Sequence, residues 1–211
     1  MHFDSKTLER LKKGRGGLQL VLDRLAFPLL ALLSVDKSAR LGFTPIDEER
    51  LRYVLKYCQG RLLDIGCGEN VLVKAWGNGI GADVYPWPGA DLIVENTARL
   101  PFDAGSFDSV SIVAALNHIP NRKDVLRECH RVLKPSGRII VTMINPFVSV
   151  LTHKIRYKYD PDQSERGMKE GEVWGFWKKQ VEGLLGEAGF TRIESESFVW
   201  WLNRVYVGYR S

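Results

Sequence analysis

A strand that runs directly into a glycine turn constrains the fold of this chain more than any other feature. Leu62 to Ile65 is a short apolar stretch, and Gly66-Cys67-Gly68 follows it at once. Glycine lets a ligand approach the backbone closely because it carries no Cβ. In open α/β sheets, ligands bind in the crevice at the carboxyl ends of the strands. The segment therefore predicts a binding site at the end of a buried strand.

Further strands and helices are predicted to alternate along the chain after this turn. Strand-like stretches lie at 79–84, 91–94, 107–113 and 138–143. Pro135-Ser136-Gly137 is expected to end the helix before the last of them. The apolar face of that helix is formed by Val125, Leu126, Cys129, Val132 and Leu133. Such alternation indicates an α/β protein with a parallel sheet and right-handed crossovers.

Helices are predicted before the first strand as well. A polar helix is expected at 5–13 and an apolar helical run at Leu18–Leu33, which Pro28 breaks or kinks. Asp23, Arg24 and Pro28 interrupt that run, so it is too short for a membrane span of about 20 residues. We interpret it as an amphipathic or buried helix.

The chain is expected to consist of a small cap and one larger domain. Residues 1–58 form the N-terminal helical cap, and residues 59–211 form the ligand-binding domain. Residues 144–172 are polar and basic without a clear period, which is typical of a lid-like insertion. A helix is predicted at 172–187 and two antiparallel strands at 191–209, with a turn near Asn203.

Asp83 provides independent support for a ligand at the first glycine turn. It stands at the end of the second predicted strand, where a carboxylate can accept two hydrogen bonds from ribose hydroxyls. A solvated aspartate at a strand end is the alternative. A Gly-x-Gly alone is weak evidence, since many turns need glycine for geometry only. Together the two features predict a nucleotide-like ligand.

With its later motifs, the chain resembles the class I S-adenosylmethionine-dependent methyltransferases and, within them, the type 11 family. The matching segments are LDIGCG at 63–68, ADV at 82–84, LPFDAGSFDSV at 100–110, NHIPN at 117–121, LRECHRVLKPSGRIIV at 126–141 and LLGEAGFTRIE at 184–194. The resemblance implies a Rossmann-like, mostly parallel seven-stranded sheet. Its last strand would run antiparallel, and helices would cover both faces.

The resemblance also implies which residues bind S-adenosylmethionine and the product S-adenosylhomocysteine. The expected cofactor-binding residues are Asp64, Gly66, Cys67, Gly68, Asp83, Val84, Asn96, Thr97, Ala115 and Leu116. Asp64 and Gly66 would face the methionine part and Gly68 the adenosine, while Asp83 would hold the ribose.

The remaining residues of this set would lie farther along the cofactor. Asn96 and Thr97 stand where the family usually has Asp-Ala, beside the adenine. Ala115, Leu116 and His118 would line the floor near the sulfonium.

Three departures from the family pattern stand out. Asn70 replaces the third glycine, and because asparagine tolerates left-handed backbone, the turn should survive. Asn96 replaces an aspartate, but its amide oxygen can still accept a hydrogen bond from the adenine amino group. Only residues 85–90 separate the second and third strands, where parallel neighbours normally need a helix. This short loop is expected to bring Trp87 over the cofactor or to leave it as a loop hydrophobe.

His118 is the expected catalytic residue. Methyl transfer needs the nucleophile held in line in a dry pocket, with a base where the acceptor proton is tightly held. Histidine can remove a proton near neutral pH, although a structural or cofactor-adjacent role is the alternative. No metal site or nucleophile triad is indicated, and Cys67 is expected to be a small packing residue.

Composition limits the partners and the compartment. The 30 basic and 25 acidic residues give a net charge of +5, which fits an anionic substrate, a membrane surface or merely a solvated basic face. No nucleic-acid-binding module is recognisable. The three cysteines form no CxxC pair, and no signal-peptide pattern opens the chain, so a cytoplasmic location is expected.

The acceptor is expected to be a small molecule, apolar or amphipathic and either anionic or lipid-like. The N-terminal helices and residues 145–177 would select it, with peripheral membrane contact as one possibility; alternatively, these segments simply pack on the sheet.

A non-catalytic partner or sensor with this fold is the second hypothesis for the function of the chain. A nicotinamide-dependent dehydrogenase is the third, but residues 66–71 lack the last glycine of its fingerprint. The oligomeric state stays open.

Overall fold

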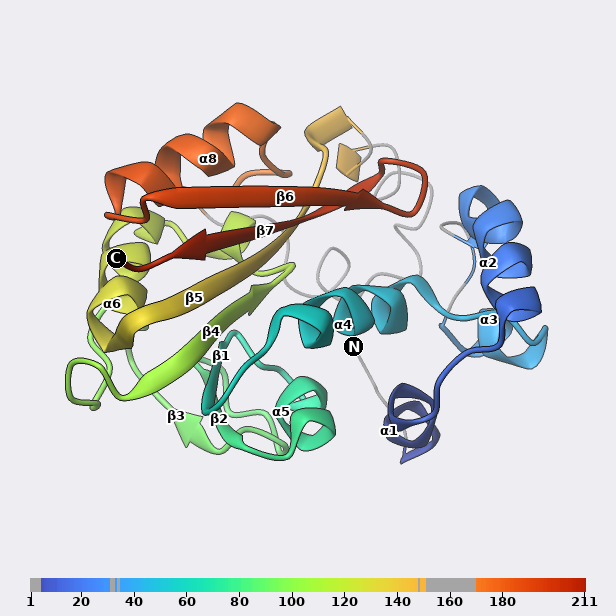
Figure 1. Cartoon of the computed structure of the whole chain (residues 1–211), viewed down its shortest axis with the longest axis horizontal. Coiled ribbons are helices and arrows are strands. Elements are labelled where there is room, and N and C mark those ends of the chain that lie inside the picture. The colour runs from blue at the N-terminus through green and yellow to red at the C-terminus, as the bar shows by residue number, and fades with distance from the viewer. Residues whose placement is uncertain (1–4, 31–32, 34, 148, 151–169) are drawn as a thin grey trace.

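One seven-stranded sheet lies at the centre of the molecule (Figure 1). The strands are β1 (Leu62–Ile65), β2 (Gly79–Asp83), β3 (Leu92–Ile93), β4 (Phe107–Val113), β5 (Leu133–Ile144), β6 (Arg192–Phe198) and β7 (Asn203–Tyr209). Their order is β3-β2-β1-β4-β5-β7-β6. β7 pairs antiparallel with β5 and β6, while all other neighbours pair parallel. The predicted sheet, with its antiparallel last strand, is confirmed.

Helices cover both faces of the sheet in this computed structural model, which describes residues 5–30, 33, 35–147, 149–150 and 170–211. They are α1 (Ser5–Lys12), α2 (Gly17–Leu30), α3 (Val35–Arg40), α4 (Ile46–Tyr57), α5 (Val71–Trp76), η1 (Leu116–His118), α6 (Arg122–Val132) and α8 (Lys178–Glu187). α4 and α5 lie against one face, and α6 and α8 against the other (Figure 1). None of the described helices combines the length and apolar character that a membrane crossing requires.

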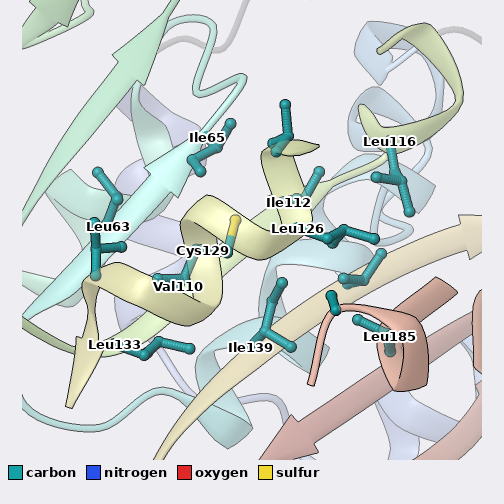
Figure 2. Close-up of a cluster of buried hydrophobic side chains, with 14 of the residues drawn as sticks. Leu63, Ile65, Val110, Ile112, Leu116, Leu126, Cys129, Leu133, Ile139 and Leu185 are labelled. Carbon is teal, nitrogen blue, oxygen red and sulfur yellow. The ribbon is translucent and has the colours of Figure 1, made fainter. Parts of the chain in front are cut away.

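Alternating side chains of the strands build a separate hydrophobic core on each face. Leu63 of β1 points toward α6 and α8, and Leu62 points toward α4 and α5. Figure 2 shows the first core, where Cys129 of α6 and Leu185 of α8 pack with apolar strand residues. Because successive strand residues face opposite sides, a strand buried on both faces must be apolar throughout, as β1 nearly is.

The N-terminal helices join the second of these cores. Leu11, Phe27 and Leu30 are buried together with residues of α4 and β1. Buried ion pairs also hold the helices to the first turn of α4, where Arg10 lies 2.8 Å from Glu48 and Arg15 lies 2.6 Å from Glu49. The division of the chain near residue 58 remains a prediction, since the cap and the sheet share this core.

The connection between β2 and β3 contains no helix, as its shortness predicts. Residues 84–91 form turns, and the loop packs directly against the glycine turn after β1. A Cβ on Gly89 would lie 2.4 Å from the Glu69 carbonyl oxygen, so only glycine permits this approach. β3 consequently pairs over two residues at the sheet edge.

Several element boundaries differ from the predicted ones. β5 begins at Leu133, because this residue pairs with Phe107 before the register shifts to Ser109 and Arg138. Pro135-Ser136-Gly137 therefore bulges within the strand, with Ser136 at a φ of 62°. The helix predicted from residue 172 begins only at Lys178, where the Gln180 side chain accepts the Trp177 N–H at 2.8 Å.

Two other predictions concern the less regular parts of the chain. α2 continues two residues past Pro28, to Leu30. Most of the predicted lid at 144–172 lies outside the described residues.

Candidate cofactor site at the carboxyl edge of the sheet

The glycine turn after β1 is shaped by two left-handed residues. Gly66 has a φ of 72° and Gly68 a φ of 52°. A Cβ on Gly66 would lie 2.9 Å from the Cβ of Ala115, whereas a Cβ on Gly68 would meet nothing within 4 Å. The Gly66 N–H donates to the Ala82 carbonyl at 2.9 Å, which ties the turn to β2. Gly66 is therefore needed for close packing, while Gly68 faces open space that a ligand can fill.

Asp83 lies at the end of β2 beside this turn, with 7% of its surface exposed. One carboxylate oxygen accepts the Gly68 N–H at 3.0 Å, and the other accepts the Tyr85 N–H at 2.9 Å. Because an ionised carboxylate has about four acceptor positions, two remain for hydroxyl donors. Asp83 is thus fixed at the glycine turn and retains the acceptors that a ribose requires.

Asp64 lies within β1 and is buried. The Ser111 hydroxyl of β4 donates to one of its carboxylate oxygens at 2.6 Å. Burial raises the pKa of Asp64 to about 7, against the lowering effect of the Ser111 bond, and the negative charge of Asp83 raises it further. A buried carboxyl with this pKa favours a cation placed beside it, since the cation stabilises the ionised form.

Asn70 preserves the turn as expected. It adopts a left-handed conformation with a φ of 59°, and its amide nitrogen donates to Asp91 at 2.7 Å. The same Asp91 oxygen accepts the Gly81 N–H at 2.8 Å. A Cβ on Gly81 would lie 2.1 Å from the Asn70 amide oxygen, so the larger residue fits only because β2 has glycine opposite.

Asn96 and Thr97 lie in the loop after β3. The Asn96 amide oxygen accepts the Ala98 N–H at 2.9 Å and the Asn121 amide at 3.1 Å. Both lone pairs are therefore in use, and an adenine amino group would have to replace one donor. Thr97 is buried, with 7% exposure. The predicted adenine contact of Asn96 stays a prediction.

Three further predicted residues differ in how they can reach a ligand. Leu116 is fully buried in the core beneath α6, so only its backbone can face the crevice. Val84 is 57% exposed at the start of the β2–β3 loop. Cys67 is a free, half-buried thiol whose pKa burial raises, which agrees with a packing residue rather than a nucleophile.

His118 ends the short helix after β4 and pairs with a buried glutamate. Its Nδ1 lies 3.3 Å from a carboxylate oxygen of Glu172, whose side chain is 2% exposed. The Val173 N–H donates to the Asn117 carbonyl at 3.0 Å, which holds the glutamate segment beside the histidine. A carboxylate on Nδ1 fixes the ring so that Nε2 is the free acceptor.

The structure thus assembles the predicted residues into two groups. Asp64, Gly66, Gly68, Asp83 and Ala115 form the first, around the glycine turn. The second contains the Asn96–Asn121 and His118–Glu172 pairs near the start of α6.

Ser111, Asp91 and Glu172 are site residues that the sequence did not predict. A serine within the apolar strand β4 was a usable signal, because a buried hydroxyl needs a partner. The sequence carries no comparable signal for Glu172. Among the described residues, no cluster of three or more His, Cys, Asp or Glu side chains could hold a metal ion.

The strand order, the glycine turn and the acidic end of β2 define the fold class of S-adenosylmethionine-dependent methyltransferases. A solved S-adenosylmethionine-dependent methyltransferase from Thermotoga maritima matches this chain with a TM-score of 0.61 at 17% identity. The match covers 78% of this chain and 89% of that one. At this identity the likeness shows the fold alone.

Residues 63–141 match the model of the methyltransferase domain family, in agreement with the type 11 resemblance. The chain is 30% identical over 135 residues to a demethylmenaquinone methyltransferase of Staphylococcus epidermidis, covering 56% of this chain and 55% of that protein. It is also 30% identical over 123 residues to a ubiquinone biosynthesis O-methyltransferase of Marinobacter nauticus, covering 47% and 52%. The chain spans about half the length of these curated relatives.

Replacing Asp64 with asparagine should change how stability depends on pH. The pKa of Asp64 is about 7 in the folded protein, against an ordinary 3.8. Between these values the folded chain holds one more proton than the unfolded chain, so its stability falls as pH rises. The asparagine still accepts the Ser111 bond without that penalty. The free energy of unfolding of Asp64→Asn, minus that of the unaltered protein, should therefore increase by up to about 4 kcal/mol from acidic to slightly alkaline pH.

Urea unfolding at about pH 4 and pH 8 measures this difference for both proteins. Parallel pH profiles for the two proteins would contradict a raised pKa at Asp64.

Proposed function

We propose that this chain is an S-adenosylmethionine-dependent methyltransferase that acts on a small-molecule acceptor. The observation that carries the proposal is the Asp83 carboxylate, held 3.0 Å from the Gly68 N–H beside open space at the glycine turn. The match of residues 63–141 to the methyltransferase domain family supports the same cofactor. When bound, S-adenosylmethionine supplies a methyl group already activated by a sulfonium.

The first group of residues fits the two ends of this cofactor chemically. Asp83 offers acceptor positions to the ribose hydroxyls, and Gly68 lets the adenosine part approach the backbone. Asp64 offers a buried carboxyl whose ionisation a nearby cation stabilises, which suits the cationic methionine end. Ala115 packs on Gly66 and narrows the crevice there.

We assign His118 as the base for the acceptor and Glu172 as the residue that positions it. The Glu172 carboxylate on Nδ1 leaves Nε2 to accept a proton. Glu172 also stabilises the imidazolium that results, because its buried negative charge lies 3.3 Å away. Proton removal by Nε2 raises the nucleophilicity of the acceptor atom.

The acceptor is proposed to be an apolar or amphipathic small molecule, not a nucleic acid. The relatives are named for demethylmenaquinone and for ubiquinone biosynthesis, which supports a ring-bearing, apolar acceptor. We propose the cytoplasm as the compartment, because all three cysteines are free thiols.

Replacing Asp83 with asparagine should weaken binding of S-adenosylhomocysteine by about 10- to 100-fold, because hydrogen bonds to a charged acceptor are lost. Isothermal titration calorimetry measures the affinity. Asp108→Asn is the matched control. Asp108 also accepts a backbone N–H, from Arg61 at 2.8 Å, but it lies near the start of β4, at the amino ends of the parallel strands. Undiminished affinity in Asp83→Asn, or no affinity in the unaltered protein, would overturn the cofactor assignment.

Replacing His118 with glutamine should lower kcat/KM by about 10²-fold or more, while the affinity for S-adenosylhomocysteine stays within about twofold of the original. Glu172→Gln should lower kcat/KM by about tenfold, because the imidazolium loses its carboxylate partner. Transfer of radiolabelled methyl to demethylmenaquinone, offered oxidised and reduced, provides the assay. Full turnover in His118→Gln would remove the base role; cofactor binding without transfer would favour the non-catalytic partner or sensor.

A further inference from the structure

The apolar face of α2 is exposed to solvent. Leu18, Val21, Leu22 and Leu25 are exposed by 76%, 54%, 43% and 68%. Their spacing of i, i+3, i+4 and i+7 places them on one stripe of the helix. Monomeric proteins rarely leave a continuous stripe of this kind in water, and such patches mark interaction sites.

The orientation of α2 is determined by a buried aspartate on its inner side. Asp23 is fully buried and accepts the Thr44 N–H at 2.9 Å and the Thr44 hydroxyl at 2.7 Å. Gln19 and Arg15 also donate to this carboxylate, at 2.9 and 3.1 Å. Rotating the leucines inward would break these bonds and expose a buried charge network, which is costly. The outward stripe is therefore part of the fold.

A pair of tryptophans extends this stripe. Trp200 and Trp201, in the turn between β6 and β7, are 48% and 75% exposed. The Trp200 indole N–H donates to the Arg24 carbonyl of α2, so turn and helix form one surface at the end toward which β6 points (Figure 1). Both tryptophans and Leu25 line a groove of about 600 Å³.

The backbone of this turn is strained in a way that displays the rings. Val199, Trp200 and Trp201 have φ values of 52°, 52° and 63°. Left-handed backbone is unfavourable for such residues and persists where the surrounding structure enforces it, commonly at functional sites.

The exposed charge on α2 is positive. Arg24 flanks the stripe, and Lys12 at the end of α1 and Lys13 precede the helix in the chain; all three are exposed. Within the part of the chain that the structure describes, none of the three forms an ion pair. A symmetric contact with a second copy would bring these cations together, whereas an anionic surface would attract them.

We propose that the outer stripe of α2 and the Trp200–Trp201 turn bind the surface of an anionic lipid bilayer. The leucines and Val21 enter the boundary between headgroups and acyl chains, tryptophan rings lie at the same level, and the cations meet lipid phosphates. The Trp200–Trp201 turn lies at the carboxyl ends of the parallel strands, because Asn203, which follows it, pairs with Ile144 at the end of β5. An apolar acceptor would thereby reach the crevice from the bilayer.

Flotation with vesicles tests the proposal on the full chain. Vesicles of phosphatidylcholine mixed with phosphatidylglycerol should bind the protein, and pure phosphatidylcholine or high salt should weaken binding. Leu18→Ser with Leu25→Ser, and separately Trp201→Ser, should each reduce partition by about tenfold or more. Trp177→Ser is the matched control, because Trp177 is 53% exposed at the N-cap of α8, which packs in the core on the other face of the sheet from α2, and it should bind as the original does.

Three outcomes would overturn the proposal. They are no binding to the anionic vesicles, an equal loss of vesicle binding in Trp177→Ser, and a dimer in sedimentation that the leucine replacements convert to monomer.

Calorimetry with S-adenosylhomocysteine separates the test of vesicle binding from the test of the proposed methyl transfer. The stripe variants should keep full cofactor affinity, and failure of vesicle binding with intact cofactor binding rejects the membrane surface alone.

Discussion

The bond from the Gly68 N–H to the Asp83 carboxylate joins the two strand ends on which the rest of the site depends. β1 and β2 pair in parallel with Ile65 opposite Ala82, so the turn after one strand and the carboxylate after the other arrive at the same edge. Gly66 closes the turn against Ala115, which follows β4. Three neighbouring strands thus contribute to one crevice, and the hydrophobic cores on both faces hold them rigid.

Much of this fold could be predicted because period and glycine placement act locally. Apolar stretches followed directly by turn residues predicted the strands of the sheet. The shortness of the Tyr85–Ala90 segment correctly predicted a crossover without a helix. The differences arise where distant residues compete with local pattern. Leu133 joins β5 because Phe107 offers a pairing partner. Residues 172–177 are not helical, and the Val173 N–H bonds to Asn117 across the site.

Site residues could be predicted where the sequence at the end of one strand determines their conformation. They could not be predicted where two segments far apart in the chain come into contact. The left-handed Asn70 followed from its residue type, but its partners Asp91 and Gly81 follow only from sheet register. Leu116 directly follows Ala115 of the crevice in the chain, yet its side chain is buried in the core. Likewise, the apolar run at Leu18–Leu33 indicates a helix, while only the bonds from Thr44 to Asp23 reveal which side faces outward.

A crystal structure with S-adenosylhomocysteine would locate the ligand relative to Asp83 and Gly68. Both ribose hydroxyls should lie within hydrogen-bond distance of the Asp83 carboxylate, and the adenosine should lie over Gly68, where a Cβ would meet no protein atom. A ligand bound elsewhere, or an Asp83 carboxylate that contacts only the Gly68 and Tyr85 N–H groups with the ligand present, would contradict this binding mode.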